Sequence, residues 1–171
     1  MKETLAIINR MQADGVIGSY AIGGAVGATF YLEPVATLGV DVFVTSPGES
    51  RSSPLSLAPI YSYLTGRGCK VKGEFVVIGE WPVQFLAAGD ELEREALAEA
   101  VEFDVEGVWT RVMSAEHLAA IALKAGRPKD FTRVLQFLEL ETVDRDKLNR
   151  ILSKHGLSDK WDKFRQGYLH E

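Results

Sequence analysis

The chain has 171 residues, of which 46% are hydrophobic and 25% are charged, a composition typical of one globular domain. The formal net charge of −5 argues against a broad basic surface for nucleic acid, and no apolar stretch is long enough to predict a membrane span. The single cysteine, Cys69, excludes an internal disulfide and favours a reducing, cytoplasmic location.

The first half of the chain is apolar and rich in glycine, and its patterns alternate between helix and strand. Apolar residues at helical spacing, with glycine or proline at the ends, predict helices over residues 5–14, 25–32 and 57–68. β-Branched runs predict strands over 16–22 and 40–44, and two more within 70–89. The polar stretch 46–54 predicts a loop.

The second half carries most of the charge and is mainly helical. Asp90 to Glu106 holds eight acids against one arginine, which indicates an exposed helix face followed by two short strands that reach residue 113. Ser114 is a predicted N-cap, and Pro128 fits the first turn of a later helix. We therefore predict a mixed α/β (α+β) core over residues 1–113, with a helical segment over 114–171 packed on it.

A glycine pair, Gly23-Gly24, lies between a predicted strand and a predicted helix. Such a pair brings backbone N–H groups close to an anion, although, taken alone, it is more often a tight turn that only glycine tolerates. The order Gly23-Gly24-Ala25-Val26-Gly27 does not match the G-x-G-x-x-G pattern of dinucleotide sites. A dinucleotide site is therefore not predicted.

The most informative pattern consists of three stretches between residues 20 and 138. They are YAIGGAVGATFYLEPVATLGVDVFV (20–44), WPVQFL (81–86) and MSAEHLAAIALKAGRPKDFTRVLQFL (113–138). In order and spacing they resemble the DNA polymerase β-type nucleotidyltransferase superfamily, especially its small bacterial antitoxin and abortive-infection-like members. That family places a glycine pair after a strand, then a helix, then T-x-D-x-D on the next strand. The resemblance implies a small mixed-sheet nucleotidyltransferase-like core followed by helices.

The resemblance also implies a site and a chemistry. Members bind a nucleoside triphosphate with Mg²⁺ and transfer its nucleotidyl group, here to an RNA or protein acceptor. Paired carboxylates at positions i and i+2 share one face of a strand and supply the oxygen ligands that Mg²⁺ prefers. Carried over by position, Asp41 is the catalytic and metal-binding residue, and the nucleotide-binding residues are Gly23, Gly24, Thr37, Lys124, Arg127, Lys129 and Asp130.

Two of the three expected carboxylates are missing, because Gly39 and Gln84 stand at those positions. Three interpretations remain open. The chain keeps the fold as a nucleotide-binding or protein-binding module, or it recruits an acid from elsewhere, or it is a structural partner, for example in a toxin–antitoxin-like pair. Acids that qualify as replacements are Glu74, Glu80 and Asp90.

Other chemistries have little support in the sequence. His117, His155 and His170 are not at metal-ligand spacing, so no zinc site is predicted. The basic residues that include Lys124 and Arg133 fit a phosphate-facing surface or a merely solvated helix face.

Overall fold

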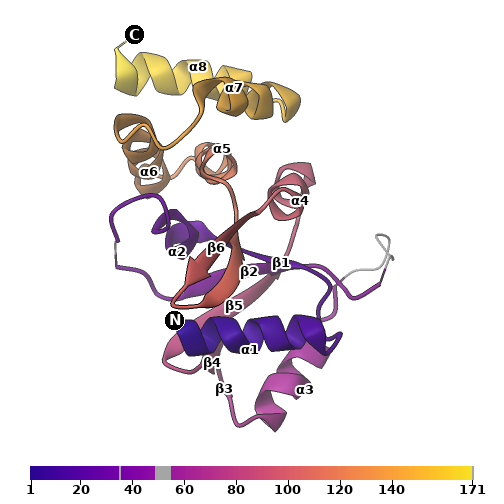
Figure 1. Cartoon of the computed structure of the whole chain (residues 1–171). Helices are drawn as coiled ribbons and strands as arrows, with labels where there is room; N and C mark the ends of the chain where they lie inside the picture. Colours follow the sequence, from indigo (N-terminus) through magenta and orange to yellow (C-terminus); the bar gives the residue numbers. More distant parts are fainter. Residues whose placement is uncertain (35, 49–54, 171) are drawn as a thin grey trace.

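A computed structural model describes residues 1–34, 36–48 and 55–170 and shows one mixed sheet with helices on both faces (Figure 1). The sheet has seven strands in the order β3-β4-β5-β2-β1-β7-β6. The pairs β2–β5 and β1–β7 are parallel and the other neighbours are antiparallel. The strands are β1 (Tyr20–Gly23), β2 (Val40–Val44), β3 (Lys70–Lys72), β4 (Phe75–Ile78), β5 (Trp81–Ala87), β6 (Val101–Val105) and β7 (Val108–Val112).

The helices divide between the two faces of the sheet. One face is covered by α1 and α3, and the other by α2, α4 and the C-terminal helices, which stack outward from the sheet (Figure 1). The helices are α1 (Lys2–Ala13), α2 (Gly24–Ala28), α3 (Ala58–Gly66), α4 (Glu91–Ala98), α5 (Ala115–Ala125), α6 (Pro128–Glu139), α7 (Arg145–Lys154) and α8 (Ser158–Phe164), which continues into one π-helical turn, η1 (Arg165–Leu169).

The α/β fold class predicted from the sequence is confirmed, and most elements lie where their patterns indicated. The main difference is in residues 70–89, which form three strands instead of two. Gly73 adopts a left-handed conformation with φ +61°, and the resulting turn joins β3 to β4. Part of the predicted polar loop, residues 49–54, lies outside the described residues.

Alternation along the strands builds two apolar cores. On β1 and β2, Ile22 and Val42 pack toward α1 and α3, whereas Ala21 and Phe43 pack toward the C-terminal helices. Successive strand residues point to opposite faces, so Asp41 shares the face of Phe43. The core on that face includes residues from α2, α4, α5, α6, α7 and α8. Asp41 is thus turned toward the C-terminal helices.

The predicted caps of the C-terminal helices are present. The Ser114 hydroxyl accepts a hydrogen bond from the His117 backbone N–H at the start of α5, and Pro128 is the first residue of α6. Between these helices, Gly126 ends α5 in a left-handed conformation with φ +70°. In the part of the chain that the structure describes, no helix combines the length and hydrophobicity needed to cross a bilayer.

Candidate functional site

The glycine pair and Asp41 lie side by side on neighbouring strands. In the β1–β2 register, Gly23 is the direct partner of Asp41. Gly24 has φ +59°, and a Cβ added there would overlap the Oδ2 atom of Asp41. A glycine is therefore required at position 24 both by the backbone conformation and by the carboxylate beside it. Of the pair predicted from the sequence, Gly24 lies against the retained acid, and Gly23 is buried beside Phe43 and Met113.

The two positions that lack an acid also border Asp41. Gln84 on β5 is its direct partner in the parallel β2–β5 register, so an amide side chain stands where the third carboxylate was expected. Gly39 precedes β2, and a Cβ added there would lie 2.7 Å from Pro82 O and 2.9 Å from Phe75 Cε1. The room that an acid at position 39 needs is thus taken by the β4–β5 hairpin.

The start of α6 carries a buried ion-pair cluster. The carboxylate of Asp130 is only 1% exposed and accepts hydrogen bonds from Arg127 Nε at 2.6 Å and Arg127 Nη2 at 3.2 Å. Arg133 Nη1 lies 3.9 Å from Asp130 Oδ1, and its side chain is 18% exposed. Asp130 therefore holds two guanidinium groups in place at the N-terminal end of the helix.

These cations act electrostatically on Asp41. Burial raises the pKa of Asp41, and the positive charges of Arg133, Arg127 and Lys129 oppose that rise while the negative charge of Glu74 adds to it. Burial also lowers the pKa of the Arg133 guanidinium. The fold thus brings the three basic residues of the α6 start close enough to Asp41 for their charges to influence its pKa.

Other predicted residues occupy different surroundings. The Lys124 ammonium pairs with Asp90 at 2.5 Å, at the start of α4. The Thr37 hydroxyl donates a hydrogen bond to Gly39 O at 3.1 Å in the exposed segment before β2. Asp130 is directed at Arg127 and Arg133, so any effect of Asp130 on a bound ligand passes through those guanidinium groups.

Arg133 and Glu74, which the sequence offered as a basic residue and as a replacement acid, also act on this surface. Arg133 lies one helical turn after Lys129, and its positive charge acts to lower the pKa of Asp41. Glu74 lies in the β3–β4 turn, directly before Phe75, and is the acid whose charge adds to that of Asp41. Of the three replacement acids that the sequence suggested, Asp90 is instead engaged with Lys124.

The oxygen atoms around Asp41 suit a magnesium ion that is shared with phosphate groups. Mg²⁺ is commonly bound by one or two carboxylates together with substrate phosphates and water. Asp41 and Gln84 lie on adjacent strands in direct register and offer a carboxylate and an amide oxygen. This donor set fits a single ion that a bound triphosphate brings with it, and it is too small for two ions held by the protein alone.

No family model matches the chain, and no curated protein matches it in sequence. Solved structures do match. The crystal structure of an antigenic nucleotidyltransferase-like protein from Paracoccidioides brasiliensis has a TM-score of 0.59 and 11% identity, covering 95% of this chain and 90% of that chain. The solution structure of the antibiotic-resistance factor ANT(2'')-Ia has a TM-score of 0.51 and 17% identity, covering 100% of both chains.

These similarities define the class of fold. The chain has a nucleotidyltransferase-like α/β fold, as the sequence resemblance predicted. Its placement in the small bacterial antitoxin branch stays a prediction. Function on such a fold depends on the residues of the site and does not follow from the fold itself.

The crowding around Gly39 gives a first testable prediction. Gly39→Asp introduces a side chain against Phe75 and Pro82 O, and we expect it to lower the free energy of unfolding by about 1–3 kcal/mol, the usual cost of overpacking. In the double variant with Phe75→Ala, the Phe75 ring no longer stands against the new side chain, and only Pro82 O remains in its way. Urea titration of both variants checks this, with Gly66→Ala as the control because a Cβ there meets open space. A fully stable Gly39→Asp single variant would contradict the packing argument.

Proposed function

We propose that the chain binds a nucleoside triphosphate together with Mg²⁺ at the Asp41 surface and transfers its nucleotidyl group to an RNA or protein hydroxyl. The observation that carries this proposal is the contact of Gly24 with the Asp41 carboxylate, on whose pKa the charges of Arg133, Arg127 and Lys129 act. A backbone without a side chain next to an acid and several bases suits a metal-bound polyphosphate. The lone cysteine and a triphosphate substrate both fit a cytoplasmic protein.

Each residue of the surface has a distinct task in this proposal. Asp41 and Gln84 hold the ion, and bound Mg²⁺ neutralises phosphate charge and polarises the reacting phosphoryl group. Arg133, Arg127 and Lys129 balance the charge of the triphosphate tail and of the leaving pyrophosphate. Gly23 and Gly24 let the backbone N–H groups approach the phosphate oxygens. Thr37 and Lys124 are assigned to the outer part of the same nucleotide site.

Isothermal titration of ATP, CTP, GTP and UTP, each with and without Mg²⁺, tests binding. We expect one nucleotide to bind in the presence of Mg²⁺, and we expect Asp41→Ala to lose that binding because it removes the carboxylate ligand. Glu102→Gln on exposed β6 is the matched control and keeps wild-type binding. Absence of binding up to millimolar nucleotide would overturn the proposal.

Transfer requires a carboxylate that acts as general base and takes the proton of the attacking hydroxyl, while the bond from the α-phosphorus to pyrophosphate breaks. Glu74 is the candidate for this base. Its charge acts on Asp41, and it adjoins Phe75, which occupies the place of the missing acid. Incubation with each α-³²P-labelled nucleotide and with cellular RNA or protein shows whether label is transferred. Glu74→Gln is expected to abolish labelling and leave nucleotide binding intact, whereas Glu80→Gln, in the turn before β5, leaves both unchanged.

A second function is favoured by the obstruction at Gly39. Because Phe75 and Pro82 O fill the space for the first acid, the chain also fits a catalytically inactive nucleotidyltransferase-fold protein that acts through a protein partner, as in a bacterial toxin–antitoxin pair. Nucleotide binding without label transfer, together with a specific complex on affinity purification from the source cells, supports this alternative. Label transfer that depends on Glu74 excludes it.

A further inference from the structure

A second cluster of ligand-type side chains lies away from Asp41, where α4 meets α5 and the end of α7. His117 Nε2 lies 3.1 Å from Glu95 Oε2, and His155 Nε2 lies 2.7 Å from the same oxygen. Glu99 Oε2 lies 3.6 Å from His117 Nε2. Sequence spacing gave no reason to associate these histidines, because they lie on different helices and meet only in the folded chain.

The cluster has the dimensions of a metal site. Glu95, Glu99 and His117 each offer a ligand atom, and these atoms all lie within 4.8 Å of one another. In a tetrahedral zinc site with ligands about 2.1 Å from the ion, neighbouring ligand atoms are about 3.4 Å apart. The separations of 3.1 and 3.6 Å from His117 Nε2 to the oxygens of Glu95 and Glu99 bracket that value. A small movement of these side chains would place an ion between them.

A hydrogen bond to Nδ1, the ring nitrogen that faces away from the carboxylates, orients the imidazole of His117. Its side chain is 0% exposed, and Nδ1 lies 2.7 Å from the Ser114 hydroxyl, which fixes the ring with Nε2 directed at the carboxylates. A hydrogen bond to the second ring nitrogen is the usual outer support of a metal-bound histidine. The arrangement therefore contains both the ligands and the support of one of them.

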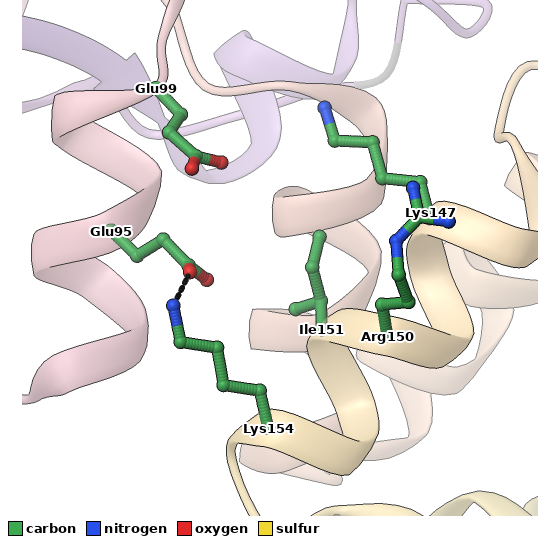
Figure 2. Close-up of a pocket in the computed structure, with 6 residues that line it drawn as sticks. All are labelled: Glu95, Glu99, Lys147, Arg150, Ile151 and Lys154. Carbon is green, nitrogen blue, oxygen red and sulfur yellow. Dashed lines mark hydrogen bonds and ion pairs between the residues drawn. The ribbon is translucent and has the colours of Figure 1, made fainter.

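Two carboxylates and three basic side chains line the opening of the cluster. Glu95 on α4 and Glu99 at its C-cap are four residues apart, where like charges repel one another. Lys154 Nζ supplies one positive charge at 2.5 Å from Glu95 Oε1, from a side chain that is 67% exposed. Figure 2 shows both carboxylates directed from α4 toward α7, across a cavity of about 360 Å³ whose far side carries Lys147 and Arg150. The cavity gives an ion a path from solvent.

We propose that Glu95, Glu99 and His117 form a binding site for one Zn²⁺ ion or a similar transition metal, which ties α4 to α5. His155 supports Glu95 from the end of α7 through its hydrogen bond to Oε2. One imidazole and two carboxylates, with water in the fourth position, are donors typical of Zn²⁺, whereas Mg²⁺ prefers oxygen alone. This site is separate from the Asp41 surface in residues and in metal preference. In the metal-bound form the ion takes the place of the proton between His117 and Glu95, and Lys154 releases Glu95.

The test uses the full chain freed of metal with a chelator and then dialysed. Titration with ZnCl₂ is followed by calorimetry and by the melting temperature, and titration with CoCl₂ by the visible absorption of four-coordinate Co²⁺. We expect saturable binding of one ion, a higher melting temperature and an intense visible Co²⁺ band. Asp41→Asn is expected to show the same metal binding, which separates this proposal from the nucleotide site.

Variants test one ligand, Glu99, and the support that His155 gives to Glu95. Glu99→Gln, at a side chain that is 56% exposed, and His155→Gln are each expected to weaken Zn²⁺ binding at least roughly 10- to 100-fold and to remain folded. Lys154→Met removes the competing ammonium and is expected to tighten binding by up to about fivefold. Glu102→Gln and His170→Gln are the matched controls and bind as wild type. No saturable binding at millimolar Zn²⁺, or binding that survives Glu99→Gln and His155→Gln, would overturn the proposal.

Discussion

Asp130→Ala is expected to lower the free energy of unfolding by about 2–3 kcal/mol. Removing one partner of a buried ion pair leaves an uncompensated charge, and here Arg133 loses its carboxylate while 18% exposed. The variant also loses the backbone hydrogen bond that Asp130 accepts from Arg127 N at 3.2 Å, part of the cap of α6. Because Arg127 is largely exposed, breaking its ion pair with Asp130 lowers the free energy of unfolding only slightly. The expected total is therefore smaller than for a fully buried ion pair.

Urea unfolding at pH 7 measures this difference. The matched control is Asp146→Ala, an exposed acid in the first turn of α7, where only the interaction with the helix dipole is lost, about 0.3–1 kcal/mol. Equal effects of the two substitutions would show that Asp130 acts as an ordinary helix-start acid. If the arginines over Asp41 bind phosphate, Asp130→Ala also weakens nucleotide binding, since their positions depend on this carboxylate.

The contribution of Asp130 to stability has a defined pH dependence. Burial acts to raise the pKa of this carboxyl, but the hydrogen bonds from Arg127 outweigh it, and the pKa lies below the ordinary value of 3.8. The folded state therefore binds this proton more weakly than the unfolded state. The stabilisation is complete above pH 3.8 and is lost as the pH falls toward the folded pKa. The stability difference between wild type and Asp130→Asn should shrink over that acidic range.

Asp41→Asn is expected to have the opposite effect on stability while it abolishes Mg²⁺-dependent nucleotide binding. Burial raises the pKa of Asp41 above 3.8 in spite of Arg133, so the folded state binds this proton more tightly than the unfolded state. Stability then falls as the pH rises from 3.8 through the folded pKa, and at pH 7 the ionised carboxylate is a net cost. The neutral amide removes that cost, and we expect a gain of about 0.5–2 kcal/mol at pH 7.

Parallel measurements of unfolding and nucleotide titration separate the two effects of this substitution. Glu102→Gln, at an exposed strand position, is expected to change neither. A loss of stability in Asp41→Asn at pH 7 would mean that the cations of α6 hold Asp41 as a structural ion pair. A gain in stability together with lost binding would identify Asp41 as a residue retained for its chemistry at a cost to the fold.

The part of the site that follows the chain locally could be predicted from the sequence. The sequence named a glycine pair at the end of one strand and an acid near the start of the next. The antiparallel pairing of β1 with β2, which was not predicted, then brings Gly23 opposite Asp41. The starts of α5 and α6 were likewise predictable, since serine is a preferred N-cap residue and proline is preferred at the first position of a helix, as at Ser114 and Pro128.

The remainder depends on contacts between distant elements. Strand β3 has only three residues and all of them are exposed, so no buried apolar residue separates it from β4 in the sequence, and the β3–β4 hairpin was not predicted. The obstruction of Gly39 by Phe75 follows from that hairpin. Charge alone also does not say which acid a basic side chain meets, and Lys124 pairs with Asp90 whereas Arg133 lies beside Asp130 and acts on the pKa of Asp41.

The left-handed Gly126 has a consequence for how a ligand meets this surface. Only Gly126 and Arg127 separate α5 from α6, and both helices are anchored in one core, so the basic start of α6 has little freedom of its own. For a ligand that bridges Asp41 and α6, both parts of the binding surface are already ordered. Binding therefore costs little conformational entropy of the chain. Binding at this surface is then expected to proceed without closure of a lid, with an association rate set by diffusion and charge steering.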